Sequence, residues 1–148
     1  MQRSRQRNAS ASVPTSLRGV IMSDLHMNHK VLIVDDVRGV AESLAAILSQ
    51  RGYLTKSARS AEDALRLIVQ WAPDFALLDV MLPGMDGINL AIALKEICPN
   101  CKVLLFSGCA ETEDLLAQAK SNGHHFEILA KPVNPRFLLE SAARMLAN

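Results

Sequence analysis

Long apolar runs, which a membrane-spanning helix needs, are missing from this sequence of 148 residues. No stretch approaches the roughly 18 consecutive apolar residues of a transmembrane helix, and residues 1–20 lack the apolar core of a secretory signal. Cysteine is also scarce, and three cysteines, an odd number, argue against a disulfide framework. These absences favour a cytoplasmic protein that does not enter a membrane.

An excess of charge of either sign is missing as well. The chain holds 16 basic and 15 acidic side chains, which gives a formal net charge of +1. Residues 1–28 carry four arginines against one aspartate, whereas the remaining residues have slightly more acids than bases. A uniformly basic nucleic-acid-binding protein is therefore not indicated, and we expect no direct binding to nucleic acid.

Size and composition predict one folded domain behind a tail. With 148 residues, 49% of them hydrophobic, the chain can bury one ordinary core and has no room for a second domain. Residues 1–28 are rich in Arg, Ser, Asn and Gln without an apolar period, so we expect a disordered basic tail. Two alternatives stay open for this tail. In the first, it is a solvated extension, and the natural protein starts at Met22 or Met27. In the second, it is a basic arm that contacts nucleic acid or anionic lipid.

A short apolar run that ends in a carboxylate lies at the centre of the sequence. It reads Phe75-Ala-Leu-Leu-Asp79, and a turn that contains Pro83, Gly84 and Gly87 follows it. A run of this length with such a turn is typical of a buried parallel strand. Asp79 is then expected at the carboxyl end of the strand, where open α/β sheets bind their ligands, as a nucleophile or a metal ligand.

Three other apolar runs also end in a polar group. They are 31–34 before Asp35-Asp36, 103–106 before Ser107-Gly108, and 128–130 before Lys131-Pro132. If these strands are parallel, three carboxylates, one hydroxyl and one amine meet at one edge of a sheet. Bare carboxylates so close would raise one another's pKa, so the cluster needs a cation. An all-oxygen ligand set suits Mg²⁺.

Helical spacing of apolar residues separates the predicted strands. We expect helices over 37–48 before Gly52, over 61–68 after a capping Ser60, over 88–97 before Pro99, from Glu111 to Gly123, and from Pro135 onward. A further strand over 53–57 alternates apolar with polar residues, as an edge strand does. Five strands that alternate with five helices predict an α/β fold with a doubly wound parallel sheet.

The polar strand ends also carry a family resemblance. The sequence resembles the receiver domain of two-component response regulators in a set of residues that follow in order: Asp35-Asp36, Asp79, Ser107 and Lys131-Pro132. The stretch Asp79-Val-Met-Leu-Pro-Gly-Met-Asp-Gly87 is similar to that family's phosphoacceptor loop nearly residue for residue. The resemblance covers about residues 29–148 and implies a five-stranded, flavodoxin-like and CheY-like sheet of strand order 2-1-3-4-5. It identifies the chain as a stand-alone, single-domain receiver.

The resemblance also implies the chemistry of the site. Asp79 would accept a phosphoryl group from a sensor histidine kinase or a histidine phosphotransfer protein. Mg²⁺ would be bound by Asp36 and Asp79, by Asp35 directly or through water, and by the backbone carbonyl of Met81. Lys131, joined to Pro132 by a cis peptide bond, would supply the remaining positive charge.

A conformational switch is the second property that the resemblance implies. The hydroxyl of Ser107 would move toward the phosphoryl group and change a protein-binding surface. The family usually places an aromatic residue three positions before the lysine, where this chain has Ile128. Phe126, on the same face by strand alternation, is our candidate for that part of the switch. The downstream target is an unnamed protein.

Other functions fit the sequence less well. An aspartate-nucleophile phosphatase needs a second aspartate two residues after the nucleophile, where this chain has Met81. A phosphate-binding P-loop is missing. A docking module that keeps the fold without phosphorylation stays open, as does an intermediate relay that passes the phosphoryl group on. Cys98 and Cys101 have the spacing of redox and zinc sites, but a second such pair is missing, so we expect a structural loop, with reversible thiol chemistry as the alternative.

Overall fold

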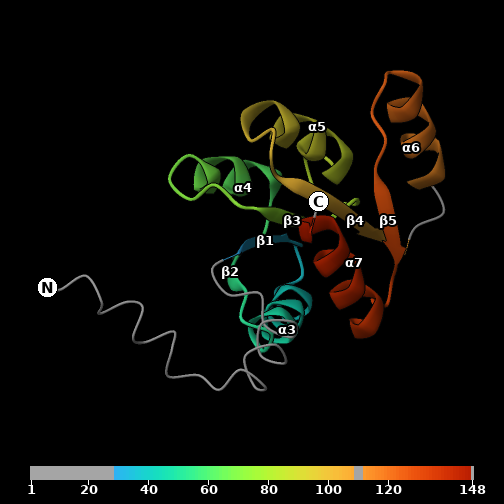
Figure 1. Ribbon diagram of the computed structural model, residues 1–148. Helices are drawn as coiled ribbons and strands as arrows, with labels where there is room; N and C mark the ends of the chain where they lie inside the picture. Colours follow the sequence, from blue (N-terminus) through green and yellow to red (C-terminus); the bar gives the residue numbers. More distant parts are fainter. Residues whose placement is uncertain (1–28, 109–111, 148) are drawn as a thin grey trace, which may run out of the picture.

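The computed structural model describes residues 29–108 and 112–147, in which five strands and five helices alternate (Figure 1). The strands are β1 (Lys30–Val34), β2 (Leu54–Ala58), β3 (Phe75–Asp79), β4 (Lys102–Ser107) and β5 (Glu127–Ala130). The helices are α3 (Arg38–Ser49), α4 (Ala61–Ile68), α5 (Gly87–Ile97), α6 (Thr112–Ser121) and α7 (Pro135–Ala147). None of these helices is long and apolar enough to cross a membrane. The predicted tail, residues 1–28, lies outside the described residues.

The five strands form one parallel sheet in the order β2-β1-β3-β4-β5. This result confirms the doubly wound fold and its strand order. In the register of the sheet, Val34 lies opposite Leu78, Asp79 opposite Phe106, and Ser107 opposite Ala130. The polar residues that end these strands therefore lie along one edge, the carboxyl edge of the sheet.

Two cores lie on the two faces of the sheet. Helices α4, α5 and α6 cover one face, and α3 and α7 cover the other (Figure 1). Successive strand residues alternate between the cores. In β3, Phe75 and Leu77 pack on the α3–α7 side, whereas Ala76 and Leu78 pack on the opposite side. By the same alternation the side chain of Asp79 belongs to the α3–α7 side.

Capping residues set where the helices begin and end. Ser60 accepts a hydrogen bond from the Asp63 N–H at 3.0 Å, which confirms it as the cap of α4. Asp86 caps α5 in the same way, through the Asn89 N–H at 2.8 Å. Gly123 follows α6 with φ at +90°, a conformation that favours glycine. Ser60 and Asp86 thus mark where two loops of the carboxyl edge end, whereas Gly123 lies at the opposite, amino edge.

The prediction for the start of the second strand was wrong by one residue. The second strand begins at Leu54 rather than Tyr53, because the Tyr53 N–H donates to the Leu48 carbonyl at the end of α3. Trp71 follows the end of α4 and packs against the core on that side of the sheet. Its ring is half-buried and stacks under Lys56, whose Nζ lies 5.4 Å from the ring centroid.

Candidate functional site

Asp35 and Asp36 follow β1 and differ in exposure. Asp35 is fully buried, and its Oδ1 accepts a hydrogen bond from the Val37 N–H at 2.8 Å. Its own N–H donates to the Ala58 carbonyl of the neighbouring strand. Asp36, the next residue, is exposed to solvent. The chain thus fixes one carboxylate inside the protein and presents the other at its surface.

Asp79 ends β3 and is held by the loop that follows it. Its side chain is buried, and its Oδ1 accepts a hydrogen bond from the Met81 N–H at 3.2 Å. The loop then turns back so closely that the Gly87 N–H donates to the Val80 carbonyl at 2.8 Å. A Cβ at Gly87 would lie 2.1 Å from the backbone oxygen of Asp79. Only glycine leaves room for this turn.

The structure brings the three predicted carboxylates together. Asp35, Asp36 and Asp79 each offer an oxygen, and these atoms all lie within 4.8 Å of one another. An all-oxygen set of carboxylates suits Mg²⁺, which is usually bound through few carboxylates plus waters and substrate phosphates. The residues therefore fit this ion. Binding of this ion by the backbone carbonyl of Met81 stays a prediction.

Lys131 reaches into the cluster from the loop after β5. Its Nζ lies 3.2 Å from Asp79 Oδ2 and 3.3 Å from Asp35 Oδ2, as predicted for the amine of the site. The cis peptide bond between Lys131 and Pro132 is also present. The Lys131 Nζ lies 4.9 Å from the ring centroid of Phe106, in the range of a cation–π contact. Phe106 was not predicted as part of the site, because its place opposite Asp79 depends on the register between β3 and β4.

Burial and charge have opposite effects on the pKa values of this cluster. Burial raises the pKa of Asp79, and the hydrogen bond and charge of Lys131, which lower it, do not outweigh this effect. Burial lowers the pKa of Lys131, but its hydrogen bonds and the charges of Asp79 and Asp35 raise it overall. The lysine therefore stays charged, yet one ammonium does not offset the burial of Asp79.

Ser107 ends β4 at the same edge of the sheet. Its hydroxyl and that of Thr112, the first residue of α6, are 2.6 Å apart and both buried. The residues of β4 that alternate with Ser107, Val103 and Leu105, pack on the side of α4, α5 and α6. The structure thus places Ser107 at the predicted edge but on the other face from Asp79. No pattern in the sequence pointed to Thr112.

A family model for the response regulator receiver domain matches residues 31–143. The chain belongs to this family. The match lies within residues 29–148, and that wider boundary stays a prediction. Receiver domains are phosphoacceptors of two-component signal transduction and generally bind Mg²⁺ at an acidic pocket, which here corresponds to the three clustered carboxylates.

Relatives and solved structures agree with this assignment. Sporulation initiation phosphotransferase F of Bacillus subtilis is 37% identical over 108 residues, which make up 72% of this chain and 84% of that protein. A receiver domain protein (CheY-like) from Methanospirillum hungatei superposes with a TM-score of 0.73 at 32% identity, over 80% of this chain and 94% of that one. The BeF3-activated DrrB receiver domain superposes with a TM-score of 0.71 at 29% identity, over 82% and 100%.

Many relatives are longer than this receiver domain. The chain spans 26% of nitrogen assimilation regulatory protein NtrX from Azorhizobium caulinodans, to which it is 34% identical over 81% of its own length. It spans 48% of PhoB from Pseudomonas aeruginosa. The comparison with these proteins therefore concerns their receiver domains.

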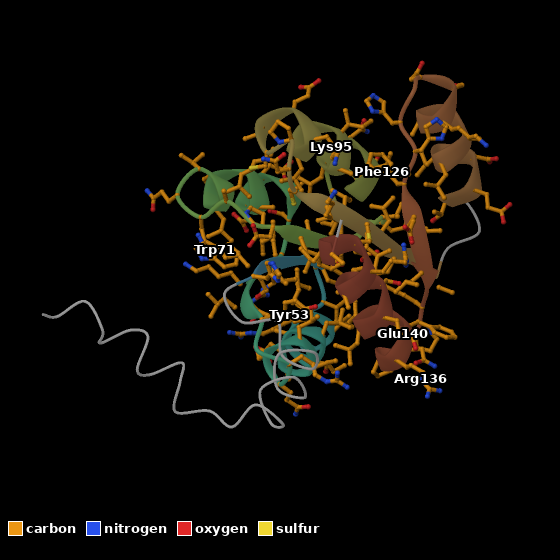
Figure 2. All side chains as sticks on the ribbon, in the orientation of Figure 1. Tyr53, Trp71, Lys95, Phe126, Arg136 and Glu140 are labelled. Carbon is orange, nitrogen blue, oxygen red and sulfur yellow. The ribbon has the colours of Figure 1, made fainter. Side chains whose placement is uncertain are left out.

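Phe126 lies away from the other predicted site residues. The register pairs Glu127 with Leu104, so Phe126 is level with the start of β4, whereas Ser107 is level with Ala130, four residues further along. Four strand residues span about 13 Å. Phe126 lies near Lys95 (Figure 2), and both line a cavity of about 160 Å³. The structure does not bring Phe126 to Ser107, and its part in the switch stays a prediction.

The cysteine pair lies at the amino edge of the sheet, opposite the site. Cys98 ends α5 through a hydrogen bond to the Leu94 carbonyl at 2.7 Å, and the Cys101 N–H donates to the Cys98 carbonyl. Cys101 is buried, and its burial, together with the nearby Cys98, raises its pKa to about 12. A protonated, buried thiol is a poor nucleophile, which favours the structural interpretation of this loop.

Proposed function

We propose that Asp79 accepts a phosphoryl group from the phosphohistidine of a histidine kinase or a histidine phosphotransfer protein, in a reaction that needs Mg²⁺. The observation that carries this proposal is the carboxylate cluster. Oxygens of Asp35, Asp36 and Asp79 lie within 4.8 Å of one another, and the Lys131 ammonium bonds two of these residues. Such a site combines a nucleophile, a place for a cation and a second positive charge.

The chemistry follows from the contacts of Asp79. A carboxylate oxygen attacks phosphorus, the bond from phosphorus to the imidazole nitrogen breaks, and the imidazole leaves as an acyl phosphate forms. The Met81 N–H and the Lys131 ammonium hold the two oxygens of this carboxylate in place before attack. After transfer, Lys131 is positioned to offset the charge of the phosphoryl oxygens. Mg²⁺, when bound, would neutralise charge that builds on the transferring group.

An apolar cavity beside Lys131 offers the phosphodonor a place to dock. It measures about 710 Å³ and lies between α3 and the loop before α7. Val37, Leu44 and Val133 are among its lining residues, and Val37 is 52% exposed. A protein donor that covers this cavity would bring its histidine to the Asp79 side of the sheet. The substitution V37S should then slow transfer from a protein donor without slowing transfer from a small phosphodonor.

The outcome of phosphorylation is a changed protein contact near Ser107, with no direct binding to nucleic acid. We place this activity in the cytoplasm and assign it to a receiver domain that occupies residues 29–148. A relay role is the alternative, in which Asp79 passes the phosphoryl group to a further histidine. The relative of which the chain spans 84% is named a phosphotransferase, which keeps the relay open.

Phosphorylation by a small donor tests the proposal. The full chain is incubated with phosphoramidate and Mg²⁺, and its intact mass is measured. One phosphoryl group is expected on the wild type and none on D79N or in the absence of Mg²⁺. D114N, which removes an exposed aspartate of α6, is the matched control and should behave like the wild type. A wild type that stays unmodified, or a D79N variant that is modified equally, would show that the chain is a docking module or uses another residue.

A further inference from the structure

The hydrogen bond between Ser107 and Thr112 ties the end of β4 to the start of α6. The two hydroxyl oxygens are 2.6 Å apart. Ser107 is 7% exposed and Thr112 is 3% exposed, so water does not readily replace either partner. A neutral hydrogen bond between buried groups matters chiefly through the cost of leaving one of them unpaired.

The face of the sheet on which this bond lies is the second observation. In β4, Leu104 and Phe106 pack on the α3–α7 side, and Phe106 lies opposite Asp79. Ser107 alternates with Val103 and Leu105, so it lies on the opposite face, where it meets Thr112 of α6. A phosphoryl group on Asp79 would therefore form on the face opposite the resting Ser107 hydroxyl. To donate to that group, the hydroxyl must leave Thr112.

We propose that Thr112 is a positioning residue that holds the Ser107 hydroxyl in its resting place and so sets how readily the switch turns on. This inference rests on the proposed function of Asp79 and Ser107. When Ser107 turns toward a phosphoryl group, the buried hydroxyl of Thr112 loses this partner. That loss favours the resting state. Thr112 thereby lowers the affinity of the domain for any group that imitates the phosphoryl group on Asp79.

Valine at position 112 has nearly the shape of threonine but has no hydroxyl. In T112V the resting state loses its bond to Ser107, and the switched state no longer leaves a hydroxyl at position 112 unpaired. Both effects favour the switched state. T112S keeps the hydroxyl and should behave like the wild type. T112A also removes the hydroxyl and provides the same test if T112V does not fold.

The experiment is a titration with beryllofluoride, an imitation of the phosphoryl group, in the presence of Mg²⁺. Amide resonances of the full chain report the bound fraction, and thermal unfolding checks that each variant is folded. We expect T112V to bind beryllofluoride roughly three- to tenfold more tightly than the wild type. This is the change in affinity that corresponds to one neutral hydrogen bond. In an S107A background, T112V should add no further change, because the hydroxyl that Thr112 holds is already absent. A purely structural role for Thr112 would not depend on Ser107.

The outcomes separate this inference from the proposed function. If the wild type binds beryllofluoride and T112V binds equally or more weakly, the role of Thr112 is wrong and the function of Asp79 stands. If T112V tightens beryllofluoride binding equally in the S107A background, the proposed role of Thr112 is also wrong. If the wild type shows no response to beryllofluoride, the proposed function is wrong, and the inference about Thr112 is wrong with it.

Discussion

The two edges of the sheet carry similar side chains but use them differently. At the carboxyl edge, Asp35 and Asp79 are buried side by side and share one lysine, so the cluster keeps an excess of negative charge. At the amino edge, Asp74 accepts a hydrogen bond from the Lys30 N–H at 2.8 Å, and Lys95 donates to the Cys101 carbonyl at 3.1 Å. There the charged groups satisfy the backbone. The charged groups of the amino edge thus stabilise the backbone, whereas the carboxyl edge keeps a buried negative charge that suits a cation.

The largest expected effect comes from the loop at the carboxyl edge. In G87A the new methyl group would meet the backbone oxygen of Asp79, so we expect a loss of roughly 3 kcal/mol or more in the free energy of unfolding. G39A is the matched control. Nothing lies within 4 Å of a Cβ at Gly39 in α3, and alanine there should stabilise by up to about 1 kcal/mol. Urea unfolding of both variants checks this prediction. A G87A variant as stable as the wild type would contradict the close turn.

The two lysines of the compared edges should differ in the same assay. K131M leaves the buried carboxylates of Asp35 and Asp79 without their ammonium, so we expect a loss of about 2 kcal/mol without Mg²⁺. Excess Mg²⁺ should reduce this loss. K95M removes an exposed ammonium whose hydrogen bond to the Cys101 carbonyl water can replace, so it should cost less than about 1 kcal/mol. If K131M and K95M lose the same free energy of unfolding, the Lys131 ammonium does not offset the charge of the buried carboxylates.

The contribution of Cys101 to stability should depend on pH only in alkaline solution. Its pKa is raised from 9.0 to about 12 by burial first and by Cys98 second. Because the unfolded thiol ionises first, this contribution to stability is complete below pH 9 and is lost, by roughly 1.4 kcal/mol per pH unit, as the pH rises toward 12. C101S should remove this part of the slope, whereas C98S should keep most of it, because burial is the larger cause. Urea unfolding at several pH values above 9 is the measurement. An unchanged slope in C101S would mean that the thiol is not buried as described.

The smallest expected effect concerns hydrolysis of the acyl phosphate. Met81 is 44% exposed beside Asp79, and its thioether orients an attacking water poorly. An amide at this position can hold such a water, so M81N should lose its phosphoryl group roughly threefold faster, the worth of one hydrogen bond. M81L should match the wild type. The decay of phosphorylated protein after removal of the donor gives the rate. The explanation fails if M81N and the wild type decay alike.

Much of the fold was predictable because β1, β3 and β4 each contain a short apolar run that is followed by a polar residue. Once such strands are parallel, their carboxyl ends lie at one edge of the sheet, and the strand order that the family resemblance implies makes β1 and β3 neighbours, which brings Asp35, Asp36 and Asp79 together. The helix ends were predictable for a similar local reason, since Ser60 and Gly123 act on backbone groups within a few residues.

The remaining contacts depend on packing between distant segments. Phe106 lies under the Lys131 ammonium because of the register between β3 and β4 and the path of the loop after β5. Thr112 of α6 meets Ser107 at the end of β4, where the two hydroxyl oxygens lie 2.6 Å apart. Phe126 was predicted beside the switch from strand alternation, which determines the face of a strand residue but not its distance along the strand. Patterns of periodicity contain none of this information.

The proposed phosphorylation depends most on Asp35, Asp36 and Asp79 binding one divalent cation together. A Mg²⁺ titration of the full chain, followed by calorimetry and by amide resonances, tests this directly. We expect one Mg²⁺ to bind per chain. Its affinity should be lower in D36N and D79N than in the wild type, and unchanged in D114N. Mg²⁺ binding that is unchanged in both D36N and D79N, or that is not detected in the wild type, would contradict the proposal.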